Sequence, residues 1–168
     1  MTLKPLCWIP VLLVAGLFPV GSLRAQGART TSATSNSEAI RVSTTLQALF
    51  TASERSDMLA LDSLYAGDSL TIFEGTGVNR GWTDYREHHL GPELKEMKNL
   101  QYRPSDLDVH VVGNSAWVLF RYTLKADVNG RAADVVGLGT AILERRGASW
   151  VVRHMHTSGR ARRPIDPA

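Results

Sequence analysis

Two histidines near the end of the chain are the first candidates for chemistry. His154 and His156 lie in the segment WVVRHMHTS, whose β-forming residues predict a strand. Alternate side chains of a strand point to the same face, so both imidazoles would share a face with Trp150. If Trp150 belongs to the core, both histidines face the interior or a pocket within it. The alternative is structural, with each imidazole hydrogen-bonded to a neighbour.

Glu74 and His89 are the next candidates. Glu74 ends a predicted strand at 69–74, and alternation groups it with the apolar side of that strand. A buried carboxylate is costly unless it is paired, so either a pair or an exposed strand end is expected. His89 follows Trp82 by seven positions, about two helical turns, and therefore shares its face. The alternative for His89 is simple packing at a helix–sheet seam.

These residue types predict two kinds of site. Glu74 with His154 or His156 could form a general acid–base pair, because burial raises the pKa of a carboxylate and lowers that of a histidine. Such a pair suits isomerisation, hydration or cyclisation of a small organic molecule, and we expect no organic cofactor. Alternatively, His154 and His156 with His89 or Glu74 could bind a transition metal such as zinc. A His-x-His pair supplies only two of the three protein ligands that a catalytic zinc site needs.

Aromatic and cationic side chains elsewhere could line a pocket for such a molecule. The candidates are Trp82 and Tyr85 on a predicted helix, and Phe120, Arg121 and Tyr122 on a predicted strand. Trp82 and Tyr85 could equally be core residues, and Arg121 could pair with Asp134 at the surface. Gly137 and Gly139 leave space for a ligand or for a bend in the sheet.

The C-terminal half of the chain predicts an antiparallel meander of four strands. Runs rich in β-forming residues cover 107–112, 116–126, 132–144 and 150–157. One of the breaks between them is Asn129-Gly130, a strong hairpin signal because both residues accept positive φ.

The first half of the chain predicts about three helices in addition to the strand at 69–74. Apolar residues at helical spacing cover 38–52 and 57–65, and a third helix runs from residue 83. Gly91-Pro92 should interrupt this third helix. Helices packed on one face of a curved sheet make an α+β domain.

Both ends of the chain predict segments outside that domain. The first 25 residues have the layout of a secretory signal, with Lys4, an apolar run and a cleavage site near Ala25. The run is shorter than the about 20 residues of a membrane span. We therefore expect export to the periplasm or the exterior, without membrane attachment after cleavage. A flexible polar linker at 26–37, a domain at 38–158 and a basic tail at 159–168 should follow.

Charge and cysteine content exclude several classes of function. The net charge is +3, and signal cleavage would remove two of the 19 basic residues against 16 acidic ones. The body of the protein then has no basic field for nucleic acid. The single cysteine, Cys7, lies in the predicted signal, so disulfides and thiol catalysis are excluded. Nucleophile, phosphate-loop and dinucleotide motifs do not occur.

The segments LDSLYAGDSLTIFEG, NRGWTDYREHHLGPEL and WVVRHMHTS, in this order, resemble the SnoaL-like group of the nuclear-transport-factor-2-like superfamily. The resemblance covers nearly all of 38–158. It implies a cone-shaped fold whose curved sheet and helices enclose a pocket for a small molecule, and a homodimer through the outer face of the sheet.

The resemblance also limits what can be said about function. The superfamily includes ketosteroid isomerase, scytalone dehydratase and polyketide cyclases beside many non-catalytic modules, so the fold alone specifies no reaction. The alternative to an enzyme is therefore a module that binds a ligand or only dimerises.

Overall fold

The protein is an α+β domain, as predicted. The structure, a computed structural model, describes residues 23–166, with side chains from residue 35 onward. The predicted signal at 1–25 thus lies almost wholly outside the described residues. The helices are α1 (Leu23–Glu54), α2 (Met58–Leu64), α3 (Trp82–Tyr85) and α4 (Gly91–Glu96). The strands are β1 (Thr71–Glu74), β2 (Gly77–Arg80), β3 (Met97–Val112), β4 (Ser115–Val128), β5 (Arg131–Arg146) and β6 (Ser149–Ala161).

The six strands form one curved sheet in the order β2-β1-β6-β5-β4-β3. Strands β3 to β6 are the predicted meander, with β3 beginning ten residues earlier than expected. The predicted α+β architecture with a curved sheet is confirmed, and two details differ from the predicted antiparallel sheet of a four-strand meander and one earlier strand. A second short strand, β2, pairs with β1, and β1 lies parallel to β6. The glycine-rich run after Glu74 forms the turn of this hairpin, with Gly75 at φ 57°.

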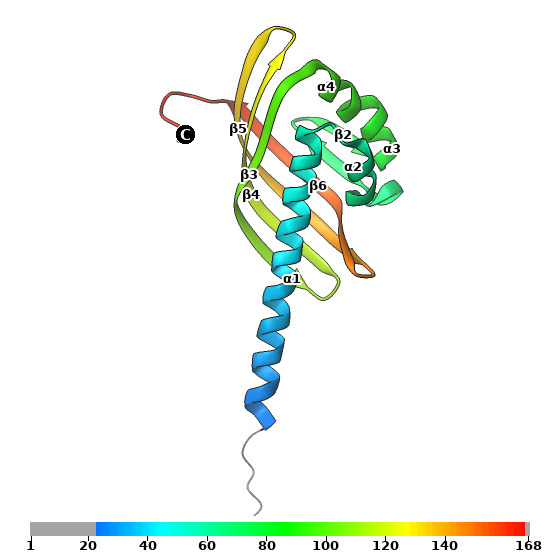
Figure 1. Cartoon of the computed structure of the whole chain (residues 1–168), viewed down its shortest axis with the longest axis vertical. Helices are drawn as coiled ribbons and strands as arrows, with labels where there is room; N and C mark the ends of the chain where they lie inside the picture. The colour runs from blue at the N-terminus through cyan, green and yellow to red at the C-terminus, as the bar shows by residue number, and fades with distance from the viewer. Residues whose placement is uncertain (1–22, 167–168) are drawn as a thin grey trace, which may run out of the picture.

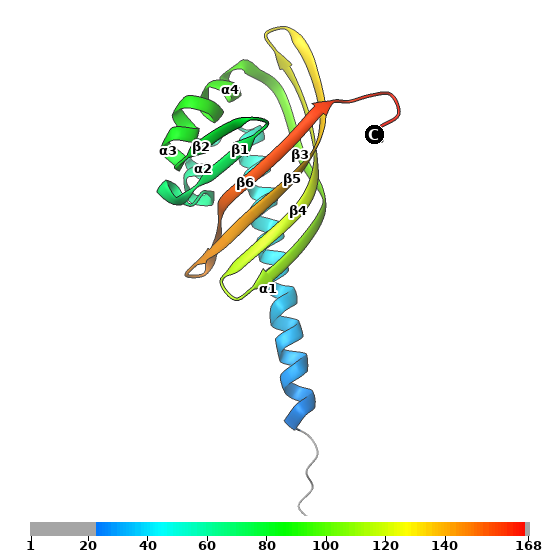
Figure 2. The ribbon, with the colours of Figure 1, turned by 180° about the vertical axis from the view of Figure 1, so that it is seen from behind.

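The helices cover one face of the sheet, and the other face lies open among the described residues (Figures 1 and 2). Breaks in the strand register curve the sheet around α1. Asn99 and Asp106 adopt positive φ at two such breaks between β3 and β4, as is usual for β-bulges. Asn129 and Gly130 both have positive φ in the hairpin between β4 and β5, as predicted.

Helix α1 is longer than the sequence suggested. The stretch 26–37, expected to be a flexible linker, continues the helix without a break and extends beyond the sheet (Figure 1). Its two alanines, with Gln26 and Arg29, have high helix propensity, its serine and threonine residues have a lower one, and no proline interrupts them. Further along, the buried side chains of Val42, Leu46, Leu49 and Phe50 recur at helical spacing and pack on the sheet. No helix within residues 23–166 is both long and apolar enough to cross a membrane.

Aromatic rings fill the space between helices and sheet. Phe50 of α1 meets Phe120 edge-on at 5.6 Å, and Tyr65 stacks on Trp82 at 4.7 Å. Phe120 and Tyr122 lie over Gly139 and Gly137, their register partners on β5. These two glycines therefore leave room for rings of the protein's own core.

Replacing Gly139 with alanine tests this packing. The new Cβ would collide with the Phe120 ring, so we expect the free energy of unfolding to fall by about 1–3 kcal/mol, as for other overpacked cores. Urea denaturation measures the change. The double variant G139A/F120L should recover part of the loss. Equal stability of G139A and the wild type would show that the ring does not need the bare backbone.

Candidate functional site

The two histidines of β6 lie on the outer face of the sheet. Register partners on the inner face continue past Arg153 as Ala141–Met155 and Gly139–Thr157, and Met155 and Thr157 are buried. His154 and His156 alternate with them and contact Phe73 of β1, with ring centroids 5.1 and 6.1 Å apart. The prediction that both share a face with Trp150 is therefore wrong.

A bulge in β6 causes this reversal. Leu143 pairs with Val152 while Ile142 pairs with His154, so Arg153 is an extra residue without a partner on β5. Trp150 and Val152 before the bulge are buried. One added residue moves every later side chain to the opposite face, and this places both imidazoles outside.

Glu74 lies on the inner face, as alternation predicted. Strand β1 runs parallel to β6 with Glu74 beside Thr157, and the Thr157 hydroxyl donates a hydrogen bond to the carboxylate. The carboxyl group is half-buried. Glu74, and neither of the β6 histidines, thus forms the polar end of the interior.

His89 approaches Glu74 from the helices. It lies on a π-helical turn, Arg86–Leu90, between α3 and α4. The helix was expected to be interrupted at Gly91-Pro92, and this π-helical turn is the form that the interruption takes. The turn brings the backbone oxygen of Arg86 so close to Gly91 that a Cβ at Gly91 would collide with it. The turn places His89 Nε2 3.4 Å from Glu74 and 3.2 Å from Glu93.

A hydrogen-bond chain fixes the orientation of the His89 ring. Asn79 Nδ2 donates to Asp84 Oδ2 at 2.9 Å, and an ionised carboxylate only accepts. Asn79 Oδ1 must therefore face His89 Nδ1, 2.8 Å away, and Nδ1 carries the proton. The hydrogen bond from Asn79, followed by that from the Arg80 N–H, holds the pKa of Asp84 below its usual range, which keeps Asp84 an acceptor. His89 Nε2 is thereby presented to the two glutamates.

The surroundings favour a proton on Glu74. Burial raises its pKa, and the nearby charge of Glu93 raises it further, while His89 and the Thr157 hydroxyl act in the opposite direction. A proton or a metal ion placed among Glu74, Glu93 and His89 would relieve the repulsion between the two carboxylates. Proton transfer or metal binding is therefore the chemistry that this cluster can support.

Three buried tyrosines lie close enough to Glu74 for its charge to affect their pKa values. Burial raises the pKa of Tyr65, Tyr85 and Tyr102, and the charge of Glu74 adds to the effect in each case. Tyr65 and Tyr85 are joined by a hydrogen bond, and the Tyr85 ring meets that of His89 edge-on at 5.3 Å. Their hydroxyls stay protonated over the whole physiological pH range and remain available as donors.

The other predicted pocket residues divide between core and outer face. Trp82, Tyr85, Phe120 and Tyr122 are buried. Trp82 donates to Asp62 Oδ1 at 2.7 Å and thereby links α3 to α2. Arg121 lies on the outer face and pairs at 3.3 Å with Asp106, whereas Asp134, its proposed surface partner, binds Arg162 and Lys125.

Three residues of the site escaped the sequence analysis: Asn79, Glu93 and Thr157. Glu93 follows His89 by four positions, a spacing that places two side chains on one helix face, and this was a usable signal. Asn79 lies on the short strand that was not predicted, and Thr157 comes to the inner face only because of the bulge.

The same cluster could hold a metal ion. One atom each from Glu74, His89 and Glu93 lies within 4.8 Å of the other two. Nitrogen and carboxylate oxygen suit zinc or manganese, and a ring N–H held by a neighbouring amide is typical around metal-bound histidines. The metal set suggested by the sequence is not assembled, because His154 and His156 lie across the sheet from His89.

Residues 42–161 match the sequence profile of a family described as the SnoaL-like domain. A search of curated proteins found no match. Solved structures with the same fold include a proposed ketosteroid isomerase from Shewanella frigidimarina, with a TM-score of 0.62 and 21% identity over 68% of this chain and 92% of that one.

Two further structures show how widely the fold is used. A proposed dehydratase of the NTF2-like family from Streptomyces avermitilis has a TM-score of 0.68 and 18% identity, covering 76% of this chain and 99% of its own. The CaMKII hub of S. rosetta has a TM-score of 0.61 and 18% identity, covering 73% and 96%. At such identities these likenesses establish the fold alone.

Replacing Glu74 with glutamine should stabilise the protein at neutral pH. A raised pKa means that the folded state binds this proton more tightly than the unfolded chain, so stability is lost as pH rises through that pKa. Glutamine removes the loss. We expect the melting temperature of E74Q to exceed that of the wild type at pH 7–8, with a difference that shrinks as pH falls towards 4.

Thermal unfolding followed by circular dichroism across this pH range measures the effect. The exposed Glu87 provides a matched control, and E87Q should follow the wild type at every pH. A lower melting temperature for E74Q at pH 8 would contradict the proposed cost of the buried charge.

Proposed function

Since the chain belongs to the SnoaL-like domain family, we propose that it binds a small organic molecule at the Glu74–His89 site and moves a proton on it. The observation that carries the proposal is the pair itself. A half-buried carboxylate with a raised pKa lies 3.4 Å from an imidazole nitrogen whose ring is held in one tautomer. Such a pair matches the requirements of general acid–base catalysis.

Each residue has a distinct part in this proposal. The ionised form of Glu74 accepts a proton from an acidic C–H or O–H bond of the substrate, and its raised pKa makes it a better base than an exposed glutamate. The proton then returns to a different atom of the same molecule, so the reaction needs no redox cofactor. Asn79 is a positioning residue, because it holds the His89 ring through Nδ1 and leaves Nε2 towards the reacting groups. Glu93 supplies the negative charge that raises the basicity of Glu74.

The reaction class is consistent with the two proposed enzymes among the structural neighbours, an isomerase and a dehydratase. Both reactions move protons on small organic molecules. We include export in the proposal, since the first 25 residues have the layout of a cleaved signal.

Hydrogen–deuterium exchange into small ketones tests the proposal, whatever the natural substrate is. Proton transfer should incorporate deuterium from D₂O into members of a panel of small cyclic ketones and β-hydroxy ketones, as followed by NMR. We expect E74Q to lower the rate by about 10²–10⁴-fold, the usual contribution of a general base. E87Q should leave the rate unchanged.

The variant E93Q distinguishes a general base from a merely structural carboxylate. Removing the charge of Glu93 lowers the pKa of Glu74, so the rising limb of the pH–rate profile should move to lower pH. Exchange should also survive EDTA. An E74Q rate equal to that of the wild type would remove Glu74 from the reaction, and loss of exchange in EDTA would replace acid–base chemistry with metal chemistry.

Assembly through the outer face is a second candidate function. Phe73, Trp117, Leu119 and Ile142 lie together on this face and are between 36% and 45% exposed. Trp117 pairs with Ile142 across β4 and β5, Ile142 pairs with His154 of β6, and His154 contacts Phe73 of β1. The four apolar side chains and the β6 histidines thus form a strip across these four strands. Contiguous exposed apolar surface of this kind marks protein interfaces. We infer that two copies of the chain meet at this strip.

Replacing Trp117 with glutamate tests the interface. A charge on the strip should turn a dimer into a monomer, measured as a halving of the mass by light scattering. Glu87→Lys, on the helices, is the control and should keep the mass of the wild type. A wild-type protein that is monomeric at the highest concentration measured would dispose of this second candidate.

A further inference from the structure

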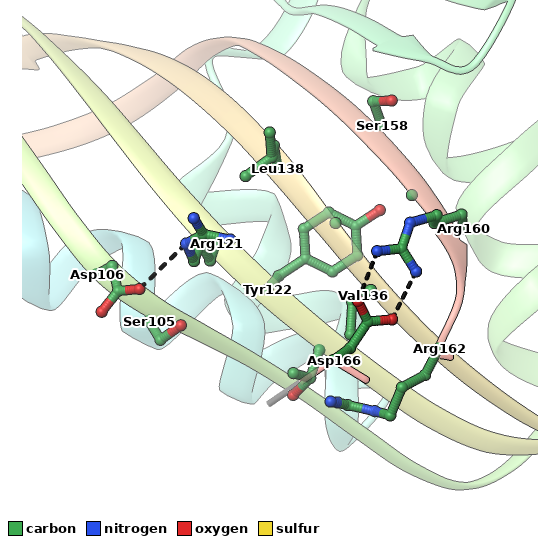
Figure 3. Close-up of a pocket in the computed structure, with 13 residues that line it drawn as sticks. Ser105, Asp106, Arg121, Tyr122, Val136, Leu138, Ser158, Arg160, Arg162 and Asp166 are labelled. Carbon is green, nitrogen blue, oxygen red and sulfur yellow. Dashed lines mark hydrogen bonds and ion pairs between the residues drawn. The ribbon is translucent and has the colours of Figure 1, made fainter. Parts of the chain in front are cut away.

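A cavity of about 640 Å³ opens where strands β4, β5 and β6 meet the C-terminal segment (Figure 3). Its lining includes Arg121, Leu138 and Ser158, which are register partners across the outer face, together with Tyr122, Val136 and Arg160. Apolar side chains thus lie beside hydroxyl and guanidinium groups. A volume of this size accommodates a small organic molecule.

The Tyr122 ring lies on the inner face, directly behind this cavity, with two glycines against it. Gly137 of β5 and Gly159 of β6 are register partners, and a Cβ on either would collide with the phenol. The cavity wall is therefore bare backbone with an aromatic ring behind it.

Asp166 occupies the cationic side of the cavity. Arg160 donates from both terminal nitrogens to its two carboxylate oxygens, at 2.6 and 2.7 Å (Figure 3). The Arg163 N–H donates to the same group at 2.7 Å. These contacts, with Arg160 the larger influence, hold the pKa of Asp166 well below its usual range, and its side chain is only 10% exposed. An anion receptor is thus assembled and filled by the chain's own carboxylate.

The segment that delivers Asp166 is held at its two ends. At one end Arg162 binds Asp134 through its backbone N–H at 2.8 Å and its Nε at 2.9 Å. At the other end the contacts are those of Asp166 itself. Between them Ile165 is 82% exposed, so little apolar burial opposes release of residues 163–166.

We propose that this cavity binds a small carboxylic acid with an apolar body, and that its carboxylate replaces Asp166 on Arg160. The forked guanidinium matches a carboxylate in two parallel hydrogen bonds, as it does now with Asp166. Leu138 and Val136 supply the surface for the apolar body. Because Asp166 is tethered six residues from Arg160, it competes as an internal ligand at high effective concentration. The cavity lies across the sheet from Glu74, so the inference does not depend on the proposed function.

Calorimetric titration with benzoate tests the competition. Asp166→Ala removes the internal anion, and we expect benzoate to bind this variant at least tenfold more tightly than the wild type. The double variant R160Q/D166A should lose this gain. Acetate, which lacks the apolar body, should bind D166A more weakly than benzoate does. Asp108→Asn, on the outer face away from the cavity, is the control and should match the wild type.

A second readout follows the tail directly. Saturating benzoate should speed hydrogen exchange at the Arg163 amide of the wild type, because that N–H donates to Asp166, and leave the Arg162 amide unchanged. Residue-resolved exchange by NMR measures both. The light-scattering mass of each variant shows whether assembly has changed. Equal benzoate affinity of D166A and the wild type, or an Arg163 amide that stays protected, would overturn the proposal and leave Asp166 as a structural clasp.

Discussion

The position of one extra residue in β6 decides which chemistry each face of this sheet can carry. Arg153 has no partner on β5, and the side chains on either side of it therefore follow opposite alternations. Without the bulge, the two imidazoles of β6 would point into the core, and Met155 and Thr157 would lie outside. With it, Thr157 hydrogen-bonds Glu74, and Met155 fills the interior beside Ile72.

The inner site also depends on how a negative charge is tolerated beside a wall of aromatic rings. Burial raises the pKa of Tyr65, Tyr85 and Tyr102, and the charge of Glu74 raises each of them further. A hydrophobic residue would cost less there. The chain instead keeps the carboxylate and brings His89 to it on a π-helical turn, a form of helix that occurs often at functional sites. A residue that destabilises the folded protein and is nevertheless present is often a functional one.

Local patterns sufficed to predict most of the fold. The helical spacing of Val42, Leu46 and Leu49 and the Asn129-Gly130 turn each correspond to an element of the structure. The parallel pairing of β1 with β6 could not be predicted, because the sequence of a four-residue strand does not indicate which strand it pairs with. The bulge did leave a sign. Trp150, Val151 and Val152 are three apolar residues in succession, all buried, and strict alternation cannot bury all three on one face.

The candidate site was predicted only as far as local geometry extends. Glu74 was placed on the correct side because alternation within β1 is unbroken, and His89 because Trp82 shares its helical face. Asn79 and Asp84 could not be joined to His89 from sequence, since that chain of hydrogen bonds depends on the packing of the β1–β2 hairpin against α3. Which nitrogen of a histidine faces its partner is thus a tertiary property.

The two faces of the sheet are separated by little more than backbone at one point. The Tyr122 ring lies on the inner face against Gly137 and Gly159, which line the outer cavity, and its pKa is raised by burial and by the charge of Glu74. Any larger residue at either glycine would push the ring away from the sheet. The requirement for glycine here is therefore steric on the inner face, and its consequence on the outer face is a cavity wall of bare backbone.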